Sequence, residues 1–95
     1  MTRPPPQLDG AQVLYYGMLD QRVKPTGRHR AIIDGHSYTP VYVAVCQYPD
    51  DSTIYRFYCD SSWNVMTDTD FETVEESIAD IERDYAGAMN IIQKY

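Results

Sequence analysis

The chain has 95 residues, a formal net charge of -6 and 43% hydrophobic residues, with nine tyrosines among them. This length suits one domain and excludes two in practice, and no apolar run approaches the roughly 18 residues of a membrane-spanning helix. The first ten residues contain prolines where a secretory signal has an apolar stretch, so we expect a soluble, cytoplasmic protein.

The acidic residues are concentrated in the second half of the sequence. Residues 50–84 contain eleven acids and two arginines, whereas residues 1–49 contain three acids and five bases. An acidic surface of this kind repels nucleic acid and attracts basic proteins. We therefore expect a basic protein partner and no direct nucleic-acid binding, unless the positive patch acts alone. That patch comprises Arg22, Lys24, Arg28 and Arg30.

Residues 1–10 are predicted to be a disordered, proline-rich arm. Pro4, Pro5 and Pro6 favour the polyproline II conformation and cannot donate backbone hydrogen bonds. The remaining residues, 11–95, are expected to form a single α+β domain. Its first strand is predicted over 12–20, with a bulge or a close contact at Gly17.

Four further segments have the composition of β-strands. A short strand is predicted over 30–34, and the most β-prone segments, 41–48 and 53–60, are joined by a four-residue hairpin loop. A last short strand is predicted over 63–67. The expected fold is α+β, with an antiparallel sheet of four to five strands and one C-terminal helix packed on one face.

The register of the main hairpin predicts two free cysteines. If the loop has four residues, Cys46 lies opposite Tyr55 and Cys59 lies opposite Tyr42. The thiols then share a face but stand four residues apart, which is about 13 Å along a strand. Because bridged α-carbons lie within about 7 Å of each other, we expect both cysteines to be reduced and buried.

Both faces of this hairpin are apolar. One carries the cysteines with aromatic residues, and the other is mainly aliphatic. Because one helix covers only one face, the second needs the N-terminal strand region, a partner chain or a target to cover it. A homodimer through this second face is one expectation. The faces comprise Tyr42, Tyr48, Tyr55 and Phe57 on one side, and Val41, Val43, Val45, Ile54 and Tyr58 on the other.

The C-terminal helix is predicted to begin between residues 70 and 74. Thr69 with Glu72, and Thr73 with Glu76, both match the capping box of a helix N-terminus. Gly87 either ends the helix or is tolerated inside it, and because the apolar stripe continues, we expect the helix to run to Ile92. The stripe comprises Val74, Ile78, Ile81, Tyr85, Ala88 and Ile92.

Four carboxylates of this helix region are spaced four residues apart, with no lysine between them. Such a row costs an isolated helix roughly 0.2 to 0.5 kcal/mol per pair of like charges. The row is either tolerated as a solvated face or retained because a basic partner docks on it. Its members are Glu72, Glu76, Asp80 and Asp84.

No catalytic, cofactor or metal site is predicted. The two histidines and two cysteines lack the paired short spacings of a zinc site. Asp68, Asp70 and Glu72 alternate like the start of a calcium loop, but the glycine and the later glutamate of that loop are missing. Cys59 with His36 has the residue types of a nucleophile and its base, but core packing of the cysteine explains it better.

One stretch resembles a pattern in small uncharacterised bacterial proteins. Tyr58, Cys59 and Asp60 are followed by Trp63, and an acidic helix follows in turn, so that the resemblance covers residues 57–86. It implies a hairpin-plus-helix arrangement and no site. In size and acidity the chain also resembles, in general character, the immunity proteins that neutralise bacterial toxins.

The leading functional hypothesis is a small acidic protein-binding module of inhibitor or immunity type, without catalytic activity. The expected docking surface is the acidic helix face, with an apolar anchor beside it. The alternatives are a structural or housekeeping homodimer, in which the carboxylates are only solvated, and a mimic of nucleic-acid phosphates. The expected partner-binding residues are Glu72, Glu75, Glu76, Asp80, Asp84, Trp63 and Tyr58.

Overall fold

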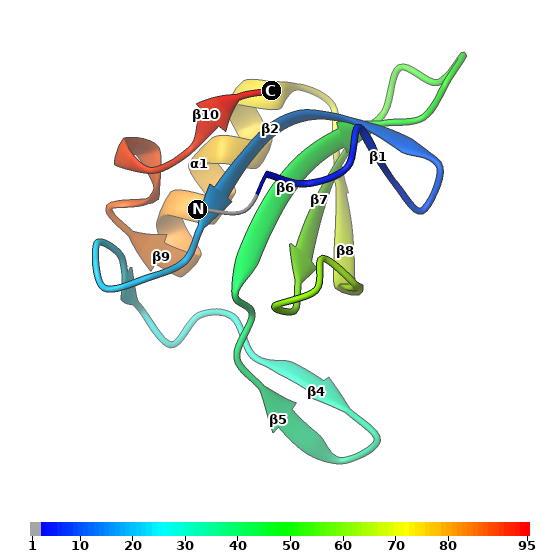
Figure 1. The fold of residues 1–95 in the computed structure, drawn as a ribbon. Helices are drawn as coiled ribbons and strands as arrows, with labels where there is room; N and C mark the ends of the chain where they lie inside the picture. The colour runs from blue at the N-terminus through cyan, green and yellow to red at the C-terminus, as the bar shows by residue number, and fades with distance from the viewer. Residues whose placement is uncertain (1–2) are drawn as a thin grey trace.

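The computed structural model describes residues 3–95 (Figure 1). In these residues, an antiparallel sheet curled into a half-barrel packs against the only α-helix. Five strands follow one another in the order β1-β2-β6-β7-β8, and β10 adds to the edge of β2 that also carries β1. The expected α+β fold is confirmed. The strands are β1 (Gln7–Leu8), β2 (Ala11–Met18), β6 (Tyr42–Gln47), β7 (Ile54–Cys59), β8 (Val65–Phe71) and β10 (Gln93–Lys94).

Smaller elements surround this sheet. The helix α1 spans Val74–Asp84, and a short 3-10 turn, η1, spans Ala88–Asn90. The strand expected over 30–34 is present as β4, but it pairs only with β5 within the described residues, and the two form a hairpin that projects from the body (Figure 1). No helix among residues 3–95 is both long and apolar enough to cross a bilayer. The remaining strands are β3 (Lys24–Pro25), which pairs with β9 (Tyr85–Ala86), β4 (Ala31–Ile33) and β5 (His36–Tyr38).

The main hairpin has the predicted register. Cys46 pairs with Tyr55 and Tyr42 pairs with Cys59. Both cysteines are free and buried, as expected. Burial raises the pKa of each thiol to about 12, so neither is a thiolate near neutral pH.

Strand β8 is longer than predicted. The strand expected over 63–67 begins only at Val65, because Trp63 adopts a positive φ of 64° in the preceding turn. It extends to Phe71. Asp60 holds that turn by accepting hydrogen bonds from the backbone amides of Ser62 and Asn64, each at 2.9 Å. These contacts lower the pKa of the Asp60 carboxyl, with those from Asn64 the strongest.

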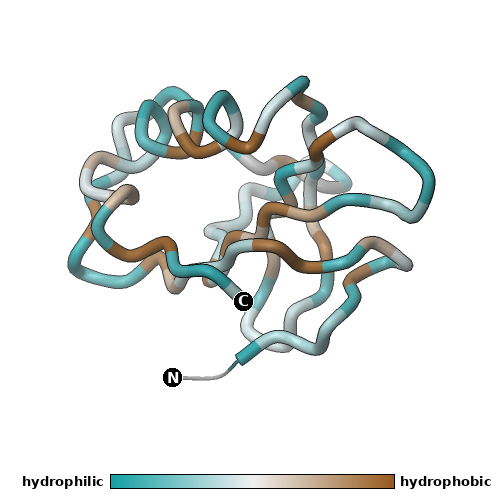
Figure 2. Tube along the Cα trace, turned by 90° about the horizontal axis from the view of Figure 1, so that it is seen from above, coloured by the Kyte–Doolittle hydropathy of each residue, from teal (hydrophilic) through white to brown (hydrophobic). Residues whose placement is uncertain are grey.

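The sheet separates two apolar clusters, and the face assignment of the main hairpin is confirmed for all its members except Val41, which packs with the cysteine face. We call them the inner cluster and the helix cluster. Figure 2 shows the apolar positions of the helix turned towards the body. The inner cluster contains Leu8, Ala11, Val13, Tyr16, Tyr42, Ala44, Cys46, Phe57, Cys59 and Trp63. The helix cluster contains Val23, Val43, Val45, Ile54, Tyr58, Ile81, Tyr85, Ala88 and Ile91.

The chain itself covers the second face of the sheet. Leu8 and Trp63 are buried in the inner cluster, and Tyr95 packs against it. The indole of Trp63 stacks on the Tyr42 ring, with 4.0 Å between the ring centroids. The N-terminal strand region, one of the three covers considered, therefore helps to close this face, and the homodimer stays a prediction.

The N-terminal segment from residue 3 onwards is ordered, which corrects the predicted disordered arm. Strand β1 pairs with β2, and Pro4 is buried. The Tyr95 hydroxyl donates a hydrogen bond of 3.0 Å to the Pro4 carbonyl, and the Arg3 guanidinium lies 4.1 Å from the centroid of the Tyr95 ring. Residues 1 and 2 of the predicted arm lie outside the described residues.

The helix begins as predicted but ends early. Thr73 is its N-cap and accepts a hydrogen bond from the Glu76 amide at 3.1 Å, which confirms the second of the two proposed starts. The predicted continuation to Ile92 is wrong, because the helix ends at Asp84 and Gly87 has a φ of 95°. The apolar stripe nevertheless packs throughout against the helix cluster, since β9, η1 and β10 keep its later members on the sheet.

Two glycines allow the chain to fold back. A Cβ at Gly17 would lie 2.5 Å from the Ile91 Cδ1 atom, so the predicted close contact at this residue is confirmed. A Cβ at Gly87 would lie 2.9 Å from the Arg22 carbonyl oxygen. The Glu82 carboxylate accepts hydrogen bonds from the backbone amides of Gly87 and Met89, which lower its pKa.

Candidate functional site

The predicted row of four carboxylates divides into an exposed half and a buried half. Glu72 and Glu76 are exposed, whereas the exposed fractions of Asp80 and Asp84 are only 8% and 4%. A step of four residues exceeds the 3.6-residue turn, so such a row winds around the helix by about 40° per step. The expectation that Asp80 and Asp84 belong to an exposed docking face is therefore wrong.

Asp80 and Asp84 form an ion cluster with the buried Arg56 and the exposed Arg28. Arg56 lies on β7, and its Nη1 atom is 2.6 Å from Asp80 Oδ2 and 3.3 Å from Asp84 Oδ2. Arg28 lies 2.8 Å from an oxygen of each carboxylate. The three buried charges of Arg56, Asp80 and Asp84 are thus paired, as buried charges require, and the exposed Arg28 balances the remaining negative charge.

Three further side chains complete this cluster. The Tyr58 hydroxyl donates a hydrogen bond of 2.6 Å to Asp84 Oδ2, and burial, followed by this bond, raises the pKa of Tyr58. Arg56 also donates a hydrogen bond to Thr69 Oγ1 at 2.8 Å. The His29 ring lies 4.4 Å from the Tyr58 ring, and burial, followed by the charge of Arg56, lowers the pKa of His29.

The sequence contained a signal for this cluster that the prediction did not use. Arg56 is the only charged residue in the six residues of β7, and its exposed fraction is 4%. A lone charge within a buried strand needs an opposite charge nearby. The acidic helix was the obvious source of this opposite charge. Which of its acids meet Arg56, however, depends on how the helix crosses the sheet.

The two predicted apolar anchors are also buried. Tyr58 has no exposed surface, and the exposed fraction of Trp63 is 7%. Tyr58 belongs to the helix cluster and Trp63 to the inner cluster, so they lie on opposite sides of the sheet. Neither ring is available to a partner in this conformation, and the prediction of a shared docking surface is wrong for both.

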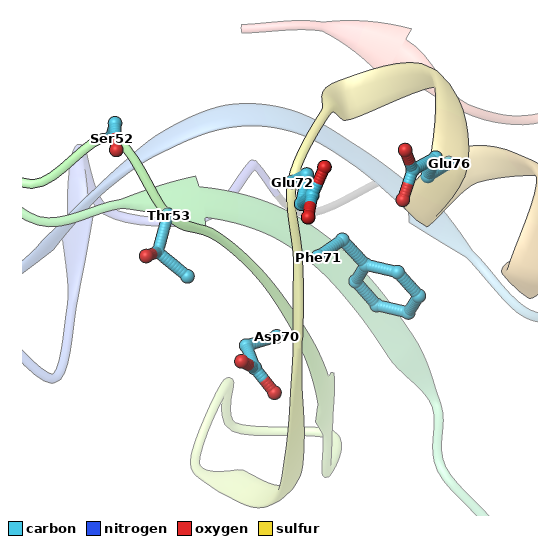
Figure 3. A pocket seen from close by; sticks show the side chains of 6 residues that line it. All are labelled: Ser52, Thr53, Asp70, Phe71, Glu72 and Glu76. Atoms are coloured by element: carbon cyan, nitrogen blue, oxygen red, sulfur yellow. The ribbon is translucent and has the colours of Figure 1, made fainter.

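The exposed carboxylates instead line an acidic pocket of about 510 Å³ at the end of β8 (Figure 3). Asp70 comes from β8, Glu72 from the following link, and Glu76 from the first turn of α1. Figure 3 shows Asp70 and Phe71 projecting on opposite sides of the strand. The lining residues are Ser52, Thr53, Asp70, Phe71, Glu72 and Glu76, and we call this feature the acidic pocket.

The acidic pocket differs from the ion cluster in having no positive charge. Within residues 3–95, the ion pairs formed by acids involve only Asp20, Asp80 and Asp84. No three His, Cys, Asp or Glu side chains in the described part of the chain converge as metal ligands. The acidic pocket suits a larger cationic group, and the Phe71 ring, on the side of the strand away from Asp70, lies towards Glu76, where it can contact an alkyl stem.

The phosphate-mimic alternative depends on an unbroken row of carboxylates, and the burial of Asp80 and Asp84 interrupts that row. Glu75 is exposed on the helix close to Glu76 and extends the negative surface outside the acidic pocket.

Comparison of the chain with models of known protein families, with curated proteins and with solved structures finds no match.

Proposed function

We propose that the chain is a small protein-binding module of inhibitor or immunity type, and that it binds a basic partner through the acidic pocket. The supporting observation is the exposed, unneutralised state of Asp70, Glu72 and Glu76. The same chain neutralises Asp80 and Asp84 internally with two arginines. A lysine or arginine side chain of a partner would supply the missing positive charge.

Charge and apolar contact have separate roles in this proposal. Complementary charges accelerate association and exclude acidic partners, and their effect weakens as salt rises. The half-buried Phe71 ring offers a contact surface for the methylene groups of the incoming side chain. The surface therefore favours a partner that presents a basic side chain on an exposed segment, and the association should be fast and sensitive to salt.

The experiment is affinity capture from a host lysate at low and high salt, followed by mass spectrometry. The pocket variant carries Glu72→Gln and Glu76→Gln, which raise the net charge by two. The matched control carries Gln12→Lys and Gln21→Lys, which raise it equally at exposed residues outside the acidic pocket. Charge reversal at Asp80 is avoided, since it would disrupt the ion cluster.

We expect the wild type and the matched control to retain the same basic protein at low salt, and the pocket variant to lose it. The purified partner should then bind the pocket variant at least tenfold more weakly, which corresponds to about 1.4 kcal/mol. Equal retention by the pocket variant would show that the acidic pocket does not bind the partner.

A further inference from the structure

The outer edge of β8 is open. This strand is the last in the sheet and pairs only with β7 within the described residues. In Figure 1, β8 lies at the margin of the sheet, and the chain continues from its end into α1. A strand with one unpaired edge presents a row of backbone N–H and C=O groups, which is a template for another extended segment.

The strand is regular where it approaches the acidic pocket. Its pairing with β7 shifts between Tyr58 and Cys59, so the irregularity lies near the start of β8. From Thr67 to Phe71, five consecutive residues pair without interruption. A stretch of this length is sufficient for a short peptide to add as a neighbouring strand.

Acidic side chains follow this edge with the period of a β-strand. Asp68 and Asp70 are exposed, and the spacing of two residues continues to Glu72. Because side chains alternate between the faces of a strand, Asp68 and Asp70 lie on the same side of β8. An added strand with a basic residue at every second position would place its charges beside them.

We propose that the partner segment held by the acidic pocket is an extended, basic strand, with lysine or arginine at alternating positions, which pairs with the open edge of β8. This inference rests on the proposed function and specifies the backbone conformation and the charge pattern of the partner. Main-chain hydrogen bonds to β8 supply part of the affinity, and the alternating charges supply the selectivity.

The same charges exclude a second copy of this chain as the occupant. Acidic residues on an edge strand are a common protection against edge-to-edge pairing. Two copies of β8 would bring Asp68 and Asp70 of one chain close to the same acids of the other, and like charges across strands are unfavourable. A basic segment removes this repulsion, so charge complementarity selects it over self-association.

The test uses an end-blocked peptide of eight residues in which lysine and valine alternate. A second peptide has the same sequence but is methylated at every backbone nitrogen, so it keeps the charges and loses all ladder donors. Binding to the full chain is measured by titration, and amide hydrogen exchange is followed over Thr67–Phe71. A third peptide, with alternating glutamate and valine, controls for charge.

We expect the lysine peptide to bind at least tenfold more tightly than its methylated form, and to slow exchange of the outward-facing amides of β8 at least tenfold. Equal binding of both lysine peptides, without protection of β8, would overturn strand pairing and leave the acidic pocket as a charge-only site. Failure of both lysine peptides to bind would overturn the proposed function as well.

A variant of the protein sharpens this test. Asp68→Lys together with Asp70→Lys reverses the charge along the edge and keeps the strand length. We expect this variant to prefer the glutamate peptide by at least tenfold. A retained preference for the lysine peptide would overturn the proposed role of the edge carboxylates.

Discussion

The two halves of the carboxylate row contain the same kind of group at the same spacing, but they differ in burial and in the charges around them. Asp80 and Asp84 are buried and neutralised, whereas Glu72 and Glu76 are exposed beside an acidic pocket. The acids of one half stabilise the contact between helix and sheet. The acids of the other half make no ion pair among the described residues, and these are the ones that we assign to a partner.

The position of each acid along the helix supports this division. Acids are favourable at the N-terminus of a helix and unfavourable at its C-terminus, because of the helix dipole. Glu76 lies in the first turn, whereas Asp84 is the last helical residue. An acid at the unfavourable end needs compensation, and Arg56, Arg28 and the Tyr58 hydroxyl provide it.

Replacement of Arg56 should have the largest effect. Arg56→Met leaves Asp80 and Asp84 with Arg28 alone, and removal of one partner from a buried ion pair costs about 3 to 5 kcal/mol. We expect the free energy of unfolding to fall by about 3 kcal/mol, the lower end of this range, because Arg28 remains. Urea unfolding followed by circular dichroism measures this free energy.

The control for this substitution is Arg83→Met, because Arg83 is exposed in the last turn of the same helix. An exposed residue of this kind should change the free energy of unfolding by no more than about 0.5 kcal/mol. If the two variants proved equally stable, the ion cluster would not be what holds the helix on the sheet.

The two halves of the row can also be compared directly by neutralising one acid in each. Asp84→Asn removes the charge that Arg28, Arg56 and Tyr58 contact, and hydrogen bonds to a charged group contribute about 1.5 to 3 kcal/mol. Glu76→Gln removes an exposed charge, so its effect on stability should stay within about 0.5 kcal/mol.

Binding of the lysine peptide should show the reverse order. Glu76→Gln should weaken it, because Glu76 lines the acidic pocket, and Asp84→Asn should leave it unchanged in the folded protein. Titration under conditions where both variants are folded measures this. A single variant that lost both stability and binding in full would contradict the separation of the two halves.

A smaller effect is expected at the helix N-cap. Thr73→Ala removes the hydroxyl that accepts a hydrogen bond from the Glu76 amide, which should lower the free energy of unfolding by about 1 kcal/mol. Because this cap fixes the first turn, peptide binding should weaken while the ion cluster persists. Thr39→Ala, at an exposed residue outside α1, is the control in the same unfolding measurement. Equal stability of the two variants would mean that the cap contributes nothing.

Patterns confined to one segment predicted most of the fold. The main hairpin, its register and the reduced state of Cys46 and Cys59 follow from alternation and loop length alone. Thr73 was identified as an N-cap because the capping box spans only four residues. Glu72 and Glu76 were proposed as partner-binding residues from the four-residue spacing of the carboxylate row, and this role stays a prediction.

Features that depend on distant contacts were not predictable in this way. The order of the N-terminal segment depends on Tyr95, which holds Pro4 from the other end of the chain. The helix ends early because Tyr85 joins β9 and pairs with β3. The burial of Asp84 depends on where the helix crosses Arg56. Asp70 was missed as a pocket residue, because its acidic surroundings resemble a loop more than an edge strand.

The smallest expected effect concerns His29, which links the ion cluster to pH. Burial and the nearby Arg56 and Arg28 lower its pKa below the ordinary 6.5, whereas Asp84 and Asp80 act in the opposite direction. The unfolded chain therefore binds more protons than the folded one near and below pH 6.5, so stability is lost as pH falls through this range. We expect the NMR titration midpoint of the His29 imidazole to lie below 6.5, and His29→Gln to reduce the difference in urea midpoint between pH 7.0 and pH 5.5. A midpoint at or above 6.5 would show that the acids of the cluster outweigh burial and the arginines at this ring.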